Sequence, residues 1–249
     1  MKPLHMGIMG LPKTGKTTFA LSVFQSKQLD PTKVLYFDNH ESTLGQVGLP
    51  KFDKKKLTGV KHAPLFSDIG ETLVEIERKM ARGDGSPFLD CIVLDDLTEQ
   101  SALSIGHLSG ESGMNMSKWG QHKLFMSSLY RSIKSVAKNT IFVLRCDWQG
   151  DPNQRPDNKT IGDQRDQKMQ PILEGAFNGW LRYDVSLLVY SSKEVRSSGK
   201  AIFSVQLQPT EEIMVENRLW SNEPRKIESA TFDTLLEILK EKEEGKEGN

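Results

Sequence analysis

The segment with the clearest chemical signature is Gly10-Leu11-Pro12-Lys13-Thr14-Gly15-Lys16-Thr17. It follows a short apolar run and precedes a helical pattern, the context in which a GxxxxGK[ST] sequence forms a phosphate-binding loop. The glycines permit a tight turn with converging backbone N–H groups, Lys16 can reach the β and γ phosphates, and Thr17 can ligate magnesium. The pattern predicts a site for ATP and Mg²⁺ made by Gly10, Pro12, Lys13, Thr14, Gly15, Lys16, Thr17 and Thr18.

A carboxylate that could complete the magnesium site follows the apolar run Leu89 to Leu94. In phosphate-binding enzymes Mg²⁺ is held by substrate phosphates together with one or two protein carboxylates. Asp95 comes directly after the run, and Asp96 lies beside it. Aspartates also end strands simply as turn formers. The combination with the phosphate-binding loop favours Thr17 and Asp95 as the metal ligands.

Hydrolysis needs a further group near the γ phosphate that orients or deprotonates the attacking water. The apolar run Val34 to Phe37 is followed by Asp38, Asn39, His40 and Glu41. We rank Glu41 first, Asp38 second and His40 third as this group, and expect Lys16 to act with it in catalysis.

Arg145 follows a fourth apolar run, Thr140 to Leu144. Ligand-binding groups gather where the carboxyl ends of parallel strands meet, so its guanidinium could sense the γ phosphate during catalysis. It could equally pair with an acidic neighbour and serve the structure alone. The sequence leaves both interpretations open.

These residues must be positioned by the elements that carry them, which alternate between short apolar runs and helical patterns over the first 190 residues. Such alternation is typical of β and α units around a parallel sheet. We expect buried strands at 4–9, 34–37, 89–94, 140–144 and 185–190, and helices at 17–27, 70–82 and 119–138.

The pattern changes after residue 192, with strand-like alternation at 201–207 and an antiparallel partner expected at 218–220. A closing helix is expected at 231–242, and the mixed charges of 241–249 are typical of a flexible tail. We therefore divide the chain into a core at 1–192, a C-terminal β addition with a helix of the same domain at 193–240, and the tail at 241–249.

Two stretches, at 106–118 and 149–170, match neither the strand nor the helix period. Long loops in compact domains are usually functional or disordered, so both are candidate moving parts. The second stretch has balanced charge and no internal aromatic residue. Contacts to single-stranded DNA depend on a positive groove and aromatic platforms. A polar loop ordered by a neighbour and a DNA-contacting loop therefore remain alternatives.

The overall composition excludes little else. With 33 basic and 33 acidic residues, total charge gives no indication of nucleic acid. Cys91 and Cys146 lie in apolar segments without metal-ligand spacing, which is typical of buried thiols. The N-terminus lacks a secretory pattern, and no apolar run approaches the roughly 20 residues that span a bilayer. We expect a cytoplasmic protein that does not contact a membrane.

The order of these motifs resembles the RecA-like ATPases and, more narrowly, phage-encoded AAA-type nucleotide-binding proteins associated with single-strand annealing and recombination. The resemblance spans roughly residues 4 to 190. Its pieces are Gly10 to Thr18, Tyr36 to Ser42, Ile92 to Thr98, Met116 to Gln121 and Ile141 to Gln149. One departure concerns catalysis: RecA-like proteins usually place the catalytic Glu two residues after the Asp that ends the second strand, where this chain has His40.

The resemblance implies a RecA-like P-loop NTPase fold, a mainly parallel α/β sheet flanked by helices, to which the sequence pattern adds the C-terminal antiparallel strands and closing helix. It also implies ATP hydrolysis coupled to single-stranded DNA, with 106–118 and 149–170 approaching the DNA, and a homo-oligomer with intersubunit ATP sites. Other phage recombination proteins would be possible partners, in the host cytoplasm. The cations that could reach a neighbouring subunit's site are Arg182, Arg196, Lys200, Arg218 and Arg225.

Two other functions fit the same residues. P-loop folds also phosphorylate small molecules, and 149–170 could be the lid that such a kinase requires. The offset of Glu41 would suit a module that binds ATP, recruits a partner and turns over negligibly. The sequence leaves these open beside the ATPase.

Overall fold

A mostly parallel sheet dominates the computed structural model, which describes residues 3–39, 59–82, 88–150, 167–173, 181, 184–210, 213, 215–219 and 226–247. The strand order is β10-β8-β7-β1-β5-β4-β2-β3. The parallel strands are β1 (His5–Gly10), β2 (Val34–Asp38), β3 (Val60–His62), β4 (Leu89–Asp95), β5 (Ala137–Gly150) and β7 (Leu187–Val195). All five predicted strands are confirmed.

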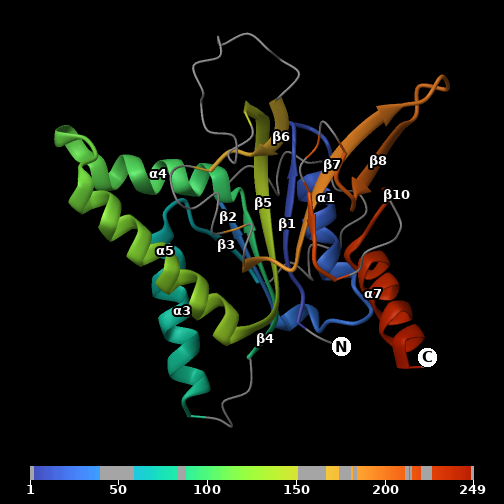
Figure 1. The fold of residues 1–249 in the computed structure, drawn as a ribbon. Helices are drawn as coiled ribbons and strands as arrows, with labels where there is room; N and C mark the ends of the chain where they lie inside the picture. The colour runs from blue at the N-terminus through green and yellow to red at the C-terminus, as the bar shows by residue number, and fades with distance from the viewer. Residues whose placement is uncertain are drawn as a thin grey trace.

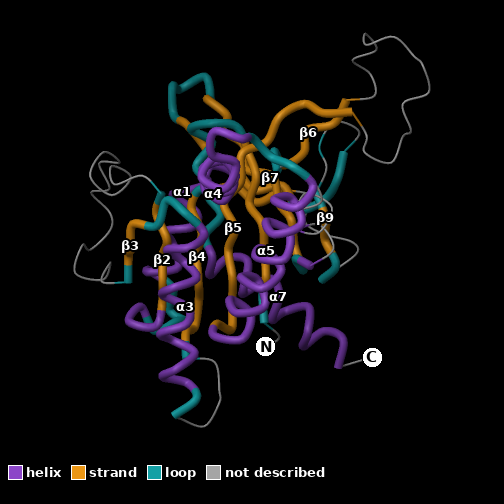
Figure 2. Tube along the Cα trace, turned by 90° about the vertical axis from the view of Figure 1, so that its left-hand side faces the viewer, coloured by secondary structure: helices purple, strands orange, loops and turns teal. Residues whose placement is uncertain are grey.

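Helices cover both faces of this sheet (Figure 1). One face carries α1 (Lys16–Leu21), the 3-10 turn η1 (Ser22–Gln25) and α7 (Phe232–Glu247). The other carries α3 (Phe66–Met80), α4 (Leu97–Ser109) and α5 (Met116–Val136), and Figure 2 looks onto that face. With antiparallel strands added beyond β7, this arrangement is the predicted RecA-like α/β fold.

The apolar runs form strands because both of their faces are buried. Side chains alternate between the two faces of a strand. In β2, Tyr36 therefore packs in the core beneath α1, whereas Phe37 packs beneath α3 and α5. A strand covered on both faces is apolar along its whole length, which explains why the central strands were visible as continuous runs.

The region 106–118 is not the long loop that we expected. Helix α4 extends to Ser109, the 3-10 turn η4 (Gly110–Ser112) follows, and α5 begins at Met116. Asp96 and Asn115 cap the two helices by accepting from the N–H groups of Thr98 and Lys118. The Gly, Ser and Asn content that suggested a loop instead supplies caps and a tight connection.

The second unassigned stretch is also partly structured. Residues 149–150 continue β5, and 167–170 belong to β6 (Gln167–Pro171), which pairs antiparallel with β5. The two strands form an arm that leaves the sheet beyond the carboxyl end of β1 (Figure 1). Residues 151–166 lie outside the described residues.

The C-terminal addition differs from the expected pairing. Strand β8 (Ala201–Gln206) is present, but its antiparallel partners are β7 and β10 (Lys226–Glu228) rather than 218–220. The short β9 (Glu216–Asn217) pairs with β7, and Trp220 lies outside the described residues. Helix α7 continues to Glu247, so helix occupies most of the expected tail at 241–249. None of the described helices is long and apolar enough to cross a membrane.

Candidate functional site

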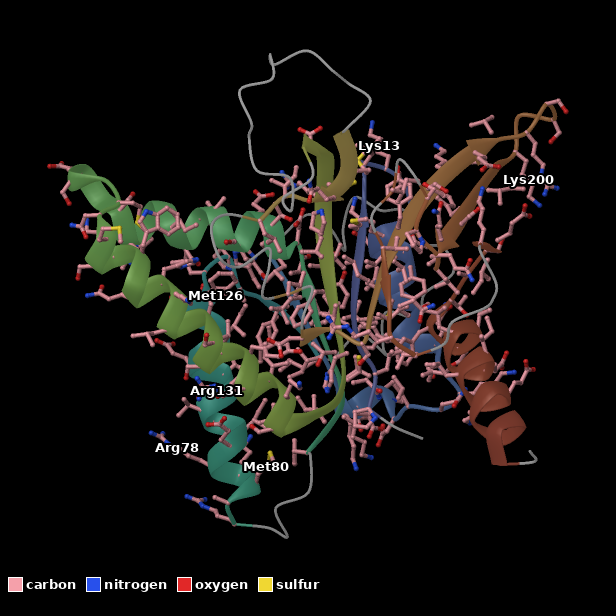
Figure 3. All side chains as sticks on the ribbon, in the orientation of Figure 1. Lys13, Arg78, Met80, Met126, Arg131 and Lys200 are labelled. Carbon is pink, nitrogen blue, oxygen red and sulfur yellow. The ribbon has the colours of Figure 1, made fainter. Side chains whose placement is uncertain are left out.

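The phosphate-binding loop connects β1 to α1 at the carboxyl edge of the sheet. Figure 3 labels Lys13 at this edge, beside the β7–β8 hairpin. Gly15 has a φ of 93°, a conformation that L side chains rarely adopt. A Cβ at Gly10 would lie 2.6 Å from both the Ser191 carbonyl oxygen and the Thr14 Oγ1. The two motif glycines are therefore required by backbone geometry.

Lys16 lies under the loop with its ammonium group turned back onto it. Its Nζ donates to the carbonyl oxygens of Gly10 and Leu11, each at 2.8 Å, and the side chain is 9% exposed. Burial lowers the pKa of Lys16, which the nearby Asp96 and Asp95 carboxylates partly oppose. A buried cation held by neutral carbonyl groups is a strong candidate to bind an anion, because phosphate oxygens are better partners for it.

Asp95 ends β4 and faces the same loop. Its carboxylate accepts hydrogen bonds from the Tyr36 hydroxyl and from the Thr17 side chain. Burial raises the pKa of Asp95 to about 6, against the lowering effect of these two donors. The contact between Thr17 and Asp95 brings the two predicted metal ligands together from segments almost eighty positions apart in the chain.

The end of β2 lies beside the end of β4. Asp38 is opposite Asp95 in the parallel register and is 4% exposed. The predicted candidates His40 and Glu41 lie outside the described residues. Asp38 is therefore the candidate for water activation whose place is known, and it lies within electrostatic range of Asp95.

Asn39 and Tyr36 are site residues that the sequence motifs do not indicate. The Asn39 backbone N–H donates to the Asp95 carbonyl at 3.1 Å, and its Oδ1 accepts from the Asp96 N–H at 3.2 Å. An asparagine after a strand often binds backbone in this way, and that signal could have indicated Asn39. The contact of Tyr36 depends on the pairing of β2 with β4, which no local pattern reveals.

The guanidinium group of Arg145 forms ion pairs with acidic neighbours. Its Nε lies 2.6 Å from Asp96 Oδ2, and its Nη2 forms a second ion pair with Glu99. Its backbone N–H donates to Thr98 Oγ1 at 2.9 Å. These contacts match the pairing alternative, while a role toward a γ phosphate stays a prediction.

The β7–β8 hairpin forms the opposite wall of the loop. Ser191 Oγ donates to the Thr14 carbonyl oxygen at 2.7 Å, and the Phe203 ring packs over Gly15. The Lys193 ammonium group lies 5.8 Å from the centre of that ring. No local sequence pattern indicates these contacts, because they join residue 14 to a hairpin about 180 positions later.

A comparison with protein families agrees with this geometry. The family model described as an AAA domain matches residues 2–219. The chain belongs to this AAA domain family. The AAA-domain protein is therefore a P-loop NTPase, and that part of the prediction is confirmed.

Other comparisons add less. Among solved structures, the flagellar accessory protein FlaH from Methanocaldococcus jannaschii is similar, with a TM-score of 0.45 and 15% sequence identity over 91% of this chain and 85% of that chain. No curated protein matches the chain in sequence.

P-loop NTPases typically use ATP and Mg²⁺, and the residues of this AAA-domain protein fit both. Within the described ranges, no group of three or more His, Cys, Asp or Glu side chains could hold a metal ion. Mg²⁺ keeps waters and takes substrate phosphates beside one or two protein ligands, so a hydroxyl and a carboxylate are a sufficient contribution from the protein. Thr17 and Asp95 would hold it, and the ion would neutralise phosphate charge.

The described residues also line a partly open pocket outside the phosphate-binding loop. It has a volume of about 310 Å³ and lies between α3, α4 and α5, with an apolar lining that includes Phe66, Leu108 and Phe125. Of the two cysteines, Cys146 lies within electrostatic range of Lys16. Cys91 and Cys146 are both buried free thiols, as predicted, and burial raises the pKa of Cys146 to about 12.

Proposed function

We propose that this AAA-domain protein hydrolyses ATP with Mg²⁺ and couples turnover to single-stranded DNA in phage-type recombination or strand annealing, as a homo-oligomer with intersubunit ATP sites. The observation that carries the nucleotide part is the joint placement of Lys16, Thr17 and Asp95. A buried ammonium group, a hydroxyl and a buried carboxylate converge on one loop.

In this proposal each residue has a distinct role. The loop N–H groups and Lys16 bind the phosphates, while Thr17 and Asp95 hold the metal ion. Asp38 or Glu41 orients the attacking water and accepts its proton. Asp38 already lies beside Asp95, which supports its inclusion.

Strand β5 connects the nucleotide site in the sheet to the arm that it forms with β6, and this connection supports coupling to DNA. The first half of β5 pairs with β1 and β4 inside the sheet, and its second half pairs with β6 in the arm. Arg145 lies between the halves and holds Asp96, the neighbour of Asp95. A change at the nucleotide site could therefore move the arm that leads to 151–166.

The test is an ATPase assay with and without single-stranded DNA at low salt, together with a mass measurement of the nucleotide-bound assembly. We expect DNA to raise turnover and nucleotide to favour an oligomer. Turnover that is unchanged by DNA at low salt would contradict the coupling, while leaving hydrolysis to be judged by the assay without DNA.

A nucleotide-gated module with little turnover is the second candidate, and the ion pairs of Arg145 favour it. A guanidinium group already held by Asp96 and Glu99 must break those contacts before it can act on a phosphate. Comparison of the wild type with Lys16→Ala and Glu41→Gln separates the two functions. An ATPase should lose hydrolysis in Lys16→Ala, and also in Glu41→Gln or, if Asp38 activates the water, in Asp38→Asn. A module should show negligible hydrolysis throughout and lose nucleotide binding in Lys16→Ala alone.

A further inference from the structure

Tyr36 places a phenol hydroxyl in the core directly against the predicted metal ligand. The side chain is completely buried in β2, and its ring packs against Phe24 with 6.2 Å between ring centres. In the register of the sheet Tyr36 is opposite Val93, two residues before Asp95. The hydroxyl spans that distance and donates to Asp95 Oδ2.

We propose that Tyr36 is a positioning residue that holds the Asp95 carboxylate in place for Mg²⁺. The proposal rests on the proposed nucleotide function. Asp95 is held by two hydroxyl donors, Tyr36 from the core and Thr17 from the loop. Thr17 belongs to the loop that would carry the phosphates, whereas Tyr36 is fixed in the core, so its bond to Asp95 does not depend on the conformation of the loop.

The hydroxyl is not needed to fill space. Phenylalanine has the same ring and would keep the packing against Phe24, so the oxygen adds a polar atom to an otherwise apolar layer. Burying a hydroxyl is unfavourable unless it is hydrogen-bonded. Here its bond is made to a carboxylate, and hydrogen bonds to charged groups are stronger than neutral ones. The position of that oxygen therefore serves Asp95.

The test is Tyr36→Phe in the full chain, with a fluorescent ADP analogue as the probe. Affinity for the probe is measured without metal in the presence of EDTA and then across a Mg²⁺ titration. We expect metal-free affinity to stay within about twofold of the wild type. The Mg²⁺ concentration that half-saturates the tightening of binding should rise roughly tenfold, as expected for the loss of one charge-assisted hydrogen bond.

Tyr130→Phe is the matched control. The Tyr130 hydroxyl is also a donor from a buried ring, but it bonds to the Asp184 carbonyl oxygen at 2.9 Å on the other face of the sheet. This variant should leave the Mg²⁺ titration unchanged. In the Asp95→Asn background, Tyr36→Phe should add little further loss, because the two residues act through one bond.

Each remaining outcome is decisive. An unchanged Mg²⁺ titration in Tyr36→Phe, or an equal shift in Tyr130→Phe, would overturn the positioning role. A Tyr36→Phe chain that does not fold would also overturn it, because the hydroxyl would then serve the fold. A wild type whose probe binding does not respond to Mg²⁺ at all would instead remove the proposed function on which the role depends.

Discussion

Two regions at the carboxyl edge of the sheet differ in how their residues are held. In the region formed by the phosphate-binding loop and the end of β4, Lys16 is held by carbonyl oxygens of the loop, and Thr17 contacts Asp95. In the region formed by the ends of β2 and β5, Arg145 is occupied by protein carboxylates. A phosphate would therefore compete only with neutral carbonyl groups for Lys16, whereas it would compete with two carboxylates for Arg145.

The largest effect is expected from a substitution in the first region. Lys16→Ala removes the buried cation that the phosphates would attract, and we expect nucleotide affinity and turnover to fall by about 100-fold or more, since hydrogen bonds between charged partners are lost in a buried site. Binding can be measured by fluorescence titration with an ATP analogue. Lys79→Ala in α3 changes an exposed lysine far from the loop and should bind as the wild type does.

The next prediction compares Asp95 of the first region with Asp38 of the second, which are neighbours in the sheet register. Asp95→Asn should weaken the Mg²⁺-dependent part of nucleotide binding by about tenfold or more, because a neutral amide is a poorer partner for the metal. Asp38→Asn should leave binding largely intact and lower kcat by roughly 100-fold if Asp38 activates water. Equal effects of the two variants on Mg²⁺ dependence would contradict this division.

Whether a site residue could be predicted from the sequence depends on whether its contacts are local or join distant segments. The phosphate-binding loop is local, so spacing alone predicts its glycines, Lys16 and Thr17, and the end of an apolar run predicts Asp95. The contacts of Tyr36, Ser191 and Phe203 depend on strand pairing between distant segments, which no single-sequence pattern specifies. Composition misled at 106–118, because residues typical of loops also cap helices.

The pairing partner of β8 shows a second limit. Alternation identified 201–207 as a strand, because one face of the hairpin packs on the core. Its outer partner is a three-residue strand at 226–228, and nothing in so short a segment distinguishes it from the expected 218–220. Short edge strands are specified by what they pair with rather than by their own pattern.

A smaller effect concerns pH, and it should appear in the first region. Because burial raises the pKa of Asp95 to about 6, its carboxylate gains a proton as the pH falls through that value. Mg²⁺ needs the ionised form, so Mg²⁺-dependent nucleotide affinity should fall about tenfold between pH 7 and pH 5. Titrations at several pH values check this, and Asp95→Asn should flatten the dependence.

The stability of the fold also depends on pH, and this dependence limits the pH range over which affinities can be compared. A raised pKa in the folded state favours protonated Asp95, so this group makes the ligand-free protein more stable as the pH falls from about 6 toward 4. His5 acts in the opposite direction. Burial lowers its pKa to about 4, so the stability linked to neutral His5 is present above pH 6.5 and is lost as the pH falls toward 4. Affinity should therefore be compared at pH 5 and above, with melting curves recorded at each pH.

The smallest expected effect tests the second region. Arg145→Ala removes a side chain that makes two ion pairs and is 44% exposed. Solvent screening should therefore limit the loss of folding stability to about 1 kcal/mol. Denaturant unfolding measures this loss.

Glu99→Gln is the matched variant, because it removes one ion pair while Arg145 keeps its bond to Asp96. If the guanidinium must leave its carboxylates to act on a phosphate, Glu99→Gln should release it and raise kcat, while Arg145→Ala should lower kcat. If Arg145 is purely structural, both variants should lose stability and leave kcat unchanged, and the second region would then depend on Asp38 or Glu41 alone.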